Sequence, residues 1–438
     1  MKTSRAGDSS LVLTVLLGGR IAGTVTEGDN NSSYRFTYDE QWQNDPRAYP
    51  LSLSIPLAGK THEGPAVGWY LRGLLPDNEA RLDAIAVRYD VDPEDTLGVL
   101  ANVGEDCPGA VQFARPDRLA SLIAPQGGRI DWLTDSEVAD LLRGLESEGE
   151  GFDTGIDVGQ FSLPGALPKV ALARDRANQR WGRPHGRAAS THILKPPLRG
   201  VPFHNEIEHL CLELARYSGL VAAKSRVIHI EGQSAIAVER YDRLRKGATI
   251  LRLHQEDCSQ ALGANPRLKY SAERAPGIAE IVGLLRDQSS RGLDDVYDFL
   301  KAVAFNWVIA GTDAHPRNYS VLIRPGGDVV LAPLYDLASA LLLKTRTRVP
   351  DLPFPMTIAG RKHIGAVDLG AWRDLAKELR LTSTRLIEEV AGIASRVADG
   401  APDVAETGKR DGLNPGFCDR FATRLRGRAL ACLADLRR

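Results

Sequence analysis

The stretch NWVIAGTDAHPRNYSVL, residues 306–322, decides the fold, and VVLAPLYDLAS, residues 329–339, follows it closely. The first stretch carries Asp313 and Asn318, and the second carries Asp336. All three polar residues stand next to segments with the apolar character of a buried core. Carboxylates in such places predict a site for chemistry rather than a solvated surface.

The residues before this loop predict a buried helix. Phe299, Val303 and Trp307 recur at helical spacing. Gly311 suits a left-handed cap at the end of that helix. The loop that follows is therefore expected to leave the core on a rigid support, while the strand predicted at VVLAPL delivers the second carboxylate.

The spacing Asp313-x-x-x-x-Asn318, with Asp336 after a strand, fits the scheme of protein kinases. In that scheme an Asp accepts the proton of the substrate hydroxyl, while an Asn five residues later and a second Asp bind magnesium. Magnesium prefers such oxygen ligands. The alternative is ordinary turn chemistry and helix capping, because Asp and Asn are common in loops.

Two further features favour the kinase interpretation. Lys195 ends a predicted strand in THILK, and Glu206 lies early in the next helix, where a strand Lys and a helix Glu pair in kinases. Each could instead be a solvated surface charge. The stretch SLPGALPK offers backbone N–H groups that could bind phosphates. It matches neither G-x-G-x-x-G nor a Walker sequence, and by itself it is little more than a hairpin turn.

Composition sets the broad class. The chain has 438 residues, 43% apolar and 25% charged, with a net charge of −1. These values predict more than one folded domain and no general affinity for nucleic acid. Five scattered cysteines without a C-x-x-C pair favour a reducing compartment. The run LVLTVLL (residues 11–17) is too short for a signal sequence and favours a strand, so we expect a cytoplasmic protein without a membrane span.

The order of predicted elements suggests three parts. Residues 1–115 form a small α+β domain, with strands in LVLTVLLGGRIAGTVTEG, YRFTYDEQW, PLSLSIPL and DCPGAVQF and helix in residues 68–90. Residues 116–245 form a connecting region with a polar loop at 145–155, followed by strands (FSLPGALPKVALAR, STHILKPP), one helix and a hairpin at Glu231-Gly232. Residues 246–438 are mostly helical, with helices predicted at 276–287, 294–310, 367–377, 383–397 and 415–436.

Seven short segments occur in a fixed order along nearly the whole chain: GLLPDNEAR, FSLPGALPK, THILKPP, AVERYDR, RLHQEDCSQALG, GTDAHPRNYS and LAPLYDLAS. Together they resemble the HipA-type serine/threonine kinases, the toxins of bacterial type II toxin–antitoxin pairs. The resemblance implies an α+β, two-lobed protein-kinase-like fold, with a small N-terminal α+β domain and a mostly helical C-terminal lobe. It also implies ATP and Mg²⁺ as cofactors.

The resemblance assigns roles residue by residue. Asp313 resembles the catalytic base, Asn318 and Asp336 the magnesium ligands, and Ser162 an autophosphorylated serine whose modification ejects the phosphate loop. Nucleotide contacts are implied for the phosphate loop Pro164, Gly165, Ala166, Leu167, Pro168 and Lys169, for Lys195, for the inter-lobe residues Glu239, Arg240 and Tyr241, and for His315, Arg317 and Tyr335.

One departure from the family pattern concerns the phosphate loop. The family shows Ala-Gly-Ala-Gln where this chain has Pro164-Gly165-Ala166-Leu167. The change removes an amide beside the phosphates, and Pro164 lacks an N–H donor. The sequence therefore leaves two hypotheses. The first is an active kinase toxin, and the second is a weakly catalytic co-repressor that works as a binding module with a DNA-binding partner.

The resemblance further implies a HipB-like helix-turn-helix antitoxin as partner, contact with DNA only through that antitoxin, and an aminoacyl-tRNA synthetase, such as glutamyl-tRNA synthetase, as substrate.

Two other patterns have ordinary explanations. His204, Glu208 and His209 could suggest a metal site, but a solvated helix face is the simpler interpretation. The basic C-terminal helix RFATRLRGRALACLADLRR is expected to carry its arginines on the solvent side of a packed helix.

Overall fold

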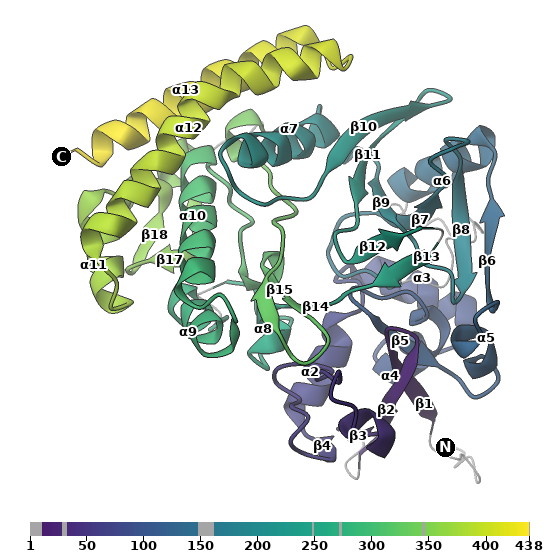
Figure 1. Cartoon of the computed structure of the whole chain (residues 1–438). Helices are drawn as coiled ribbons and strands as arrows, with labels where there is room; N and C mark the ends of the chain where they lie inside the picture. Colours follow the sequence, from purple (N-terminus) through teal and green to yellow (C-terminus); the bar gives the residue numbers. More distant parts are fainter. Residues whose placement is uncertain are drawn as a thin grey trace, which may run out of the picture.

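A computed structural model describes residues 11–28, 33–147, 162–247, 249–270, 274–343 and 347–437. Figure 1 shows three parts in chain order: an N-terminal unit in purple, a strand-rich lobe in blue and teal, and a helical lobe in green and yellow. The N-terminal unit lies against both lobes, at the side where they meet. No helix in the described ranges combines the length and apolar content needed to cross a membrane.

The N-terminal unit is built on a five-stranded antiparallel sheet with the order β4-β3-β2-β1-β5. Gly18 and Gly19 turn the first hairpin with φ values of 60° and 79°, which glycine adopts without a steric clash. The elements are β1 (Val12–Leu17), β2 (Arg20–Glu27), β3 (Tyr34–Tyr38), α1 (Glu40–Gln43), β4 (Thr61–Glu63), α2 (Pro65–Gly73), α3 (Glu79–Tyr89), α4 (Thr96–Val103) and β5 (Val111–Ala114).

Two predictions for this unit were wrong in detail. Residues 50–57 form no strand, only an isolated bridge between Ser52 and Ile55. The N–H of Leu53 donates to the Glu256 side chain over 2.8 Å, so a distant side chain replaces a neighbouring strand. The helical stretch 68–90 is broken between α2 and α3, where Pro76 lacks an N–H and Asn78 caps the second helix.

The strand-rich lobe contains a six-stranded sheet with the order β10-β11-β9-β7-β8-β6. The predicted hairpin turn at Glu231-Gly232 is confirmed, and the predicted single helix packs on the sheet as α7. The elements, including a short helix that precedes the lobe, are α5 (Leu119–Ile123), β6 (Gly128–Trp132), α6 (Asp135–Ser147), β7 (Val170–Arg174), β8 (Trp181–Gly186), β9 (His192–Lys195), α7 (His204–Tyr217), β10 (Ser225–Ile230) and β11 (Gln233–Glu239).

Three details of this lobe differ from the sequence interpretation. Ser162 and Leu163 are irregular rather than part of a strand, and Ser162 is hydrogen-bonded to Leu74 and Asp106 of the N-terminal unit. The polar loop expected at 145–155 begins later, since α6 continues through Ser147, and the rest of that segment lies outside the described residues. The edge strand β6 was missed because Gly128–Trp132 is exposed and lacks clear alternation.

The helical lobe is centred on α10, whose Phe299, Val303 and Trp307 are buried as predicted. All five predicted helices of this lobe are present. The elements are β12 (Arg243–Lys246), β13 (Thr249–Arg252), β14 (His254–Asp257), α8 (Cys258–Ala261), α9 (Ile278–Gln288), α10 (Leu293–Ile309), β15 (Ser320–Ile323), β16 (Val329–Leu331), β17 (Pro353–Ile358), β18 (Arg361–His363), α11 (Leu369–Glu378), α12 (Ser383–Arg410) and α13 (Pro415–Asp435).

The end of α10 is capped by a different residue from the predicted one. Ala310, with φ of 54°, takes the left-handed position, and Gly311 does not. Gly311 serves close packing instead, since a Cβ there would lie 2.3 Å from Asn306 Oδ1. The loop still leaves the helix at this point.

The long helix α12 extends beyond its predicted end near residue 397 to Arg410, through Gly400 and Pro402. A Cβ at Gly400 would overlap the Tyr217 ring at 2.2 Å, so this glycine lets α12 approach α7 closely. The C-terminal helix α13 packs along α12 with Arg424 and Arg426 exposed, which confirms the expectation of a solvent-facing basic side.

Candidate active site

The loop after α10 presents Asp313 to solvent, with 69% of its side chain exposed. A base that must meet a substrate hydroxyl needs such access. Asn318 Nδ2 donates to the Asp313 carbonyl over 2.6 Å, within a turn at Pro316–Asn318. This bond fixes the loop and directs the amide nitrogen inward, so the Asn318 oxygen remains for a cation.

Asp336 comes to the same place from β16, through irregular residues rather than on the strand itself. Its φ is 52°, which is uncommon for a residue with a side chain. Backbone strain of this kind concentrates at functional sites. Partial loss of water and the negative charge of Asp336 both raise the pKa of Asp313, so the two carboxylates act on each other.

Lys195, at the end of β9, joins this site to the strand-rich lobe. Its buried ammonium donates to Glu208 Oε1 over 2.7 Å and also to Asp336 Oδ1. Burial alone would lower the pKa of Lys195, but the carboxylates of Asp336 and Glu208 outweigh it and raise that pKa. The pKa of Asp336 falls to about 2 because Lys195 and Lys169 overcome the effect of its burial. Lys195 therefore links α7 to the loop that bears Asp336.

The prediction that Lys195 pairs with Glu206 was wrong. Its partner is Glu208, two residues further along α7. Two residues on a helix are about 200° apart, so Glu206 faces another direction. The solvated face expected for Glu208 and His209 is also wrong, since both are buried. The sequence contained one indication of this: Glu208 stands within the apolar run of α7, beside Cys211 and Leu212 in the next turn.

This correction gives a direct test. We expect Glu208→Gln to reduce phosphoryl transfer about 10- to 100-fold, because a hydrogen bond to a charged group contributes about 1.5–3 kcal/mol. The matched control is Glu206→Gln, on the same helix with the same change in charge, which should leave the rate within about twofold. Initial rates of phosphate incorporation measure both. Equal losses in the two variants would remove the Lys195–Glu208 pair from the account.

The residues fit a magnesium–nucleotide complex in their chemistry. Asp336 and Asn318 supply a carboxylate and an amide oxygen, both of which suit magnesium. Within the described part of the chain, no group of three or more His, Cys, Asp or Glu residues could hold a metal. A magnesium ion here would take its other ligands from phosphates and water, as is usual for this ion. At the other pattern noted in the sequence, Glu208 pairs with Lys195 and His209 Nδ1 lies 2.9 Å from Ser225 Oγ.

The phosphate loop Pro164–Lys169 forms a tight turn in which Gly165 has φ of 110°. Lys169 Nζ donates to the Pro164 carbonyl over 2.6 Å and closes the turn from inside. Burial lowers the pKa of Lys169 to about 8. The exposed Ala166 and partly exposed Leu167 and Pro168 form the outer part of the turn.

Each of the three inter-lobe residues has its side chain in a different environment; they are Glu239, Arg240 and Tyr241. The Glu239 carboxylate pairs with Arg176 at 3.1 Å, and the Tyr241 ring stacks on Tyr335 with centroids 5.8 Å apart. The Arg240 side chain turns away into a buried cluster of charges. Its implied contact with a nucleotide remains a prediction, and the structure gives its guanidinium other partners.

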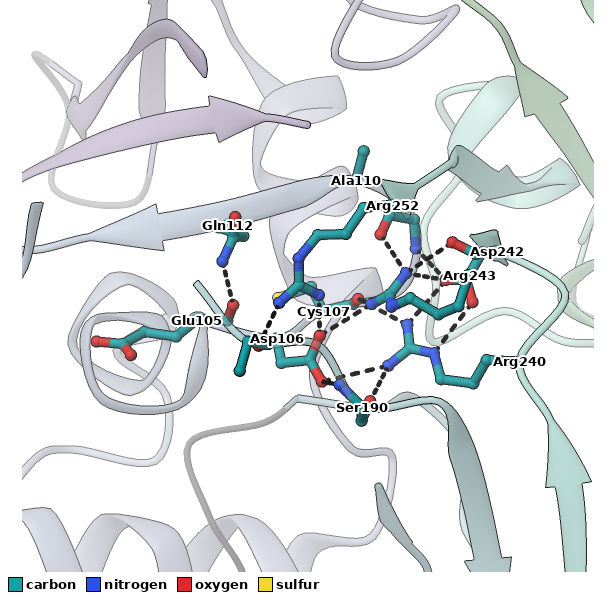
Figure 2. Close-up of polar contacts among 12 residues, drawn as sticks. Glu105, Asp106, Cys107, Ala110, Gln112, Ser190, Arg240, Asp242, Arg243 and Arg252 are labelled. Atoms are coloured by element: carbon teal, nitrogen blue, oxygen red, sulfur yellow. Dashed lines mark hydrogen bonds and ion pairs between the residues drawn. The ribbon is translucent and has the colours of Figure 1, made fainter. Parts of the chain in front are cut away.

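This cluster joins the N-terminal unit to the inter-lobe segment, as Figure 2 shows. Asp106 Oδ1 accepts from Arg243 over 2.9 Å and also from Arg252, and Asp106 Oδ2 lies 3.6 Å from Arg240. Asp242 pairs with Arg240 and Arg243 at 2.8 and 2.9 Å. Burial would raise the pKa of Asp106, but the three arginines hold it far below its ordinary value. No local pattern in the sequence indicates that Asp106 and residues 240–252 meet.

Of the remaining predicted residues, His315 and Arg317 belong to the catalytic loop itself, Tyr335 contacts that loop and Ser162 contacts the N-terminal unit. Ser162 is buried, and its hydroxyl donates to the Leu74 carbonyl over 2.7 Å. Arg317 is also buried and donates to Asp77 of the N-terminal unit. The Tyr335 hydroxyl donates to the Arg317 carbonyl over 2.8 Å. Burial, followed by Lys269 and Arg317, lowers the pKa of His315 to about 4, so His315 is neutral at pH 7.

A strand-rich lobe carries a buried Lys–Glu pair, its lysine reaches Asp336 of the helical lobe, and a loop of that second lobe bears Asp313 and Asn318. This arrangement defines a protein-kinase-like fold. Comparison with solved structures agrees with this class and confirms the fold predicted from the sequence. HipA from the Shewanella oneidensis complex of HipA, HipB and operator DNA matches with a TM-score of 0.81 and 23% identity, over 97% of this chain and 98% of that one.

Sequence comparison defines the family. The HipA N-terminal domain matches residues 13–114, and the HipA-like C-terminal domain matches residues 161–403. The Sinorhizobium fredii protein named "Putative kinase Y4mE" is 32% identical over 95% of this chain and 97% of its own length. The serine/threonine-protein kinase toxin HipA of Shewanella oneidensis is 26% identical over 75% of each chain. The chain belongs to the HipA family.

Proposed function

We propose that the protein is an ATP-dependent, non-specific serine/threonine protein kinase that acts as a growth-inhibiting toxin. The observation that carries this proposal is the buried ammonium of Lys195, which bridges Glu208 on α7 and Asp336 beside the catalytic loop. A purely structural ion pair would not require the strained backbone of Asp336 or the exposed carboxyl of Asp313.

Each side chain has a defined task in the proposed reaction. ATP with magnesium, when bound, supplies the phosphoryl group. Asp313 orients the substrate hydroxyl and accepts its proton, and Asp336 and Asn318 hold the metal. Lys195 contacts the phosphates, and Glu208 keeps its ammonium in place. The raised pKa of Asp313 makes it a stronger base than an ordinary aspartate.

The proposed protein substrate is an aminoacyl-tRNA synthetase, such as glutamyl-tRNA synthetase, whose phosphorylation would halt translation. This choice rests on the family resemblance and on the relative named as a serine/threonine-protein kinase toxin. Substrate choice depends on surface contacts that the catalytic residues do not determine.

The proposed partner is a HipB-like helix-turn-helix antitoxin that neutralises the kinase in the cytoplasm. The solved HipA structure that this chain resembles contains HipB and operator DNA. The net charge of −1 favours DNA contact only through such a partner. Gel-shift assays with each chain alone and then together test this, and tight, sequence-specific DNA binding by this chain alone would contradict it.

Ser162 tests the activity within the protein itself. We expect incubation with ATP and magnesium to phosphorylate Ser162, which would add about −1.5 to −2 charges beside the nucleotide phosphates. Because Ser162 is buried and bonded to Leu74, modification requires its segment to move out of the site. Mass spectrometry measures the modification, and an unmodified Ser162 in a protein that phosphorylates other substrates would contradict this role.

A further inference from the structure

The turn between α2 and α3, residues 74–78, contacts both the phosphate loop and Ser162, which directly precedes that loop. The Leu74 carbonyl accepts from the Ser162 hydroxyl over 2.7 Å. The Asp77 N–H donates to the Gly165 carbonyl over 3.3 Å, and Asn78 Nδ2 lies 3.5 Å from the Ala166 carbonyl. A turn of the N-terminal unit therefore supports the phosphate loop through its own backbone and side chains.

The Asp77 carboxylate also reaches the catalytic loop. Arg317 NH1 donates to Asp77 Oδ1 over 2.6 Å, and Lys269 Nζ lies 2.9 Å from Asp77 Oδ2. Arg317 is only 3% exposed in its side chain, and its guanidinium also contacts the Pro266 carbonyl at 3.2 Å and the Gly73 carbonyl at 3.4 Å. A second carboxylate, that of Asp257, lies 3.6 Å from Arg317 Nε, but Asp77 makes the shorter contact. A buried guanidinium depends strongly on its carboxylate partners. Arg317 lies between Asp313 and Asn318 in sequence, so this ion pair acts on the loop that bears both.

The support itself is fixed, because the N-terminal unit is docked on the segment 254–260. His254 Nε2 lies 2.8 Å from the Leu51 carbonyl. Gln260 Nε2 donates to the Tyr70 carbonyl of α2 over 3.1 Å. Together with the bond from Leu53 to Glu256, these contacts hold α2, and with it the 74–78 turn, against the helical lobe. They also give a function to the sequence segment RLHQEDCSQALG, which the catalytic chemistry does not use.

We propose that Asp77 is a positioning residue for the kinase reaction: it lies in the N-terminal unit and holds the catalytic loop, through Arg317, in register with the phosphate loop. The inference rests on the proposed function. It means that the N-terminal unit completes the active site rather than serving only as a platform for a partner. Loss of the Asp77 charge should let the catalytic loop shift relative to the nucleotide site.

The test compares Asp77→Asn with Glu94→Gln in the full chain. Glu94 of the N-terminal unit also forms an ion pair, with Arg267 at 2.9 Å, but both side chains are exposed and neither belongs to the catalytic loop. For Asp77→Asn we expect kcat to fall about 10- to 100-fold, since a small misplacement of reacting groups has effects of this size. The KM for ATP should change by less than about twofold, because the backbone bonds to the phosphate loop remain. Asp77→Glu, which keeps the charge, should lose less.

A second measurement is independent of catalysis. Hydrogen exchange at residues 313–319 should be faster in Asp77→Asn than in the unmodified protein and unchanged in Glu94→Gln, with melting temperatures recorded for all three. The proposal would be overturned if Asp77→Asn and Glu94→Gln had the same kcat and the same rate of hydrogen exchange at these residues. An inactive unmodified protein would instead contradict the proposed kinase function, and exchange would still decide whether Asp77 holds the loop.

Discussion

Replacement of Asp313 by Asn is expected to reduce phosphoryl transfer by about 10²- to 10⁴-fold, the usual contribution of a positioned acid or base. The amide has the size of the carboxyl but cannot accept the proton of the substrate hydroxyl. The fold should be unaffected, because the Asp313 side chain is 69% exposed and lies 3.8 Å from a neutral His315 rather than in an ion pair. Initial rates of phosphate incorporation and thermal unfolding measure the two effects.

The matched control is Asp328→Asn. Asp328 is a partly exposed carboxylate between β15 and β16 that pairs with Arg324 at 3.1 Å. This variant has the same change in charge and should keep the transfer rate within about twofold. A rate for Asp313→Asn that is close to normal, with ATP binding intact, would mean that Asp313 is not the base.

Asp106→Asn is expected to lower the free energy of unfolding by about 3–5 kcal/mol, the usual cost of removing one partner from a buried ion pair. Asp106 is 5% exposed and faces Arg240, Arg243 and Arg252 (Figure 2). Neutralising it leaves three buried guanidinium groups with one remaining carboxylate, that of Asp242. Denaturant unfolding followed by circular dichroism measures the change.

Asp117→Asn gives the comparison for an exposed pair. Asp117 pairs with Arg115 at 3.0 Å, but both side chains are largely in water. Its loss should change stability far less than the loss of Asp106, because water screens an exposed pair. If Asp106→Asn costs less than about 1 kcal/mol, the cluster does not hold the N-terminal unit to the inter-lobe segment.

Local patterns in the sequence predicted the framework of the site. The apolar spacing of Phe299, Val303 and Trp307 predicted α10, and the turn at Glu231-Gly232 predicted the β10–β11 hairpin. These elements follow from short-range rules, because helical and strand periodicity depend on neighbouring residues. The loop with Asp313 and Asn318 follows from the end of one such helix.

Contacts between distant residues could not be predicted in the same way. Glu206 and Glu208 are both early in α7, and only the packing of that helix decides which one faces Lys195. In the apparent strand at 50–57, the N–H of Leu53 is bonded to Glu256, some two hundred residues away. Asp77 and Asp106 meet their arginines only after the N-terminal unit docks, so no local pattern marks them.

In an active kinase, Asp336 and Asn318 would bind ATP through magnesium and Lys195 would contact its phosphates, despite the Pro164 and Leu167 changes in the phosphate loop. Calorimetric titration of ATP into the unmodified protein and Asp336→Ala, with and without magnesium, tests this most directly. Magnesium is expected to strengthen ATP binding to the unmodified protein by about tenfold or more, and Asp336→Ala is expected to lose this gain. ATP binding that is absent, or equal with and without magnesium in both proteins, would contradict the account and favour a non-catalytic binding module.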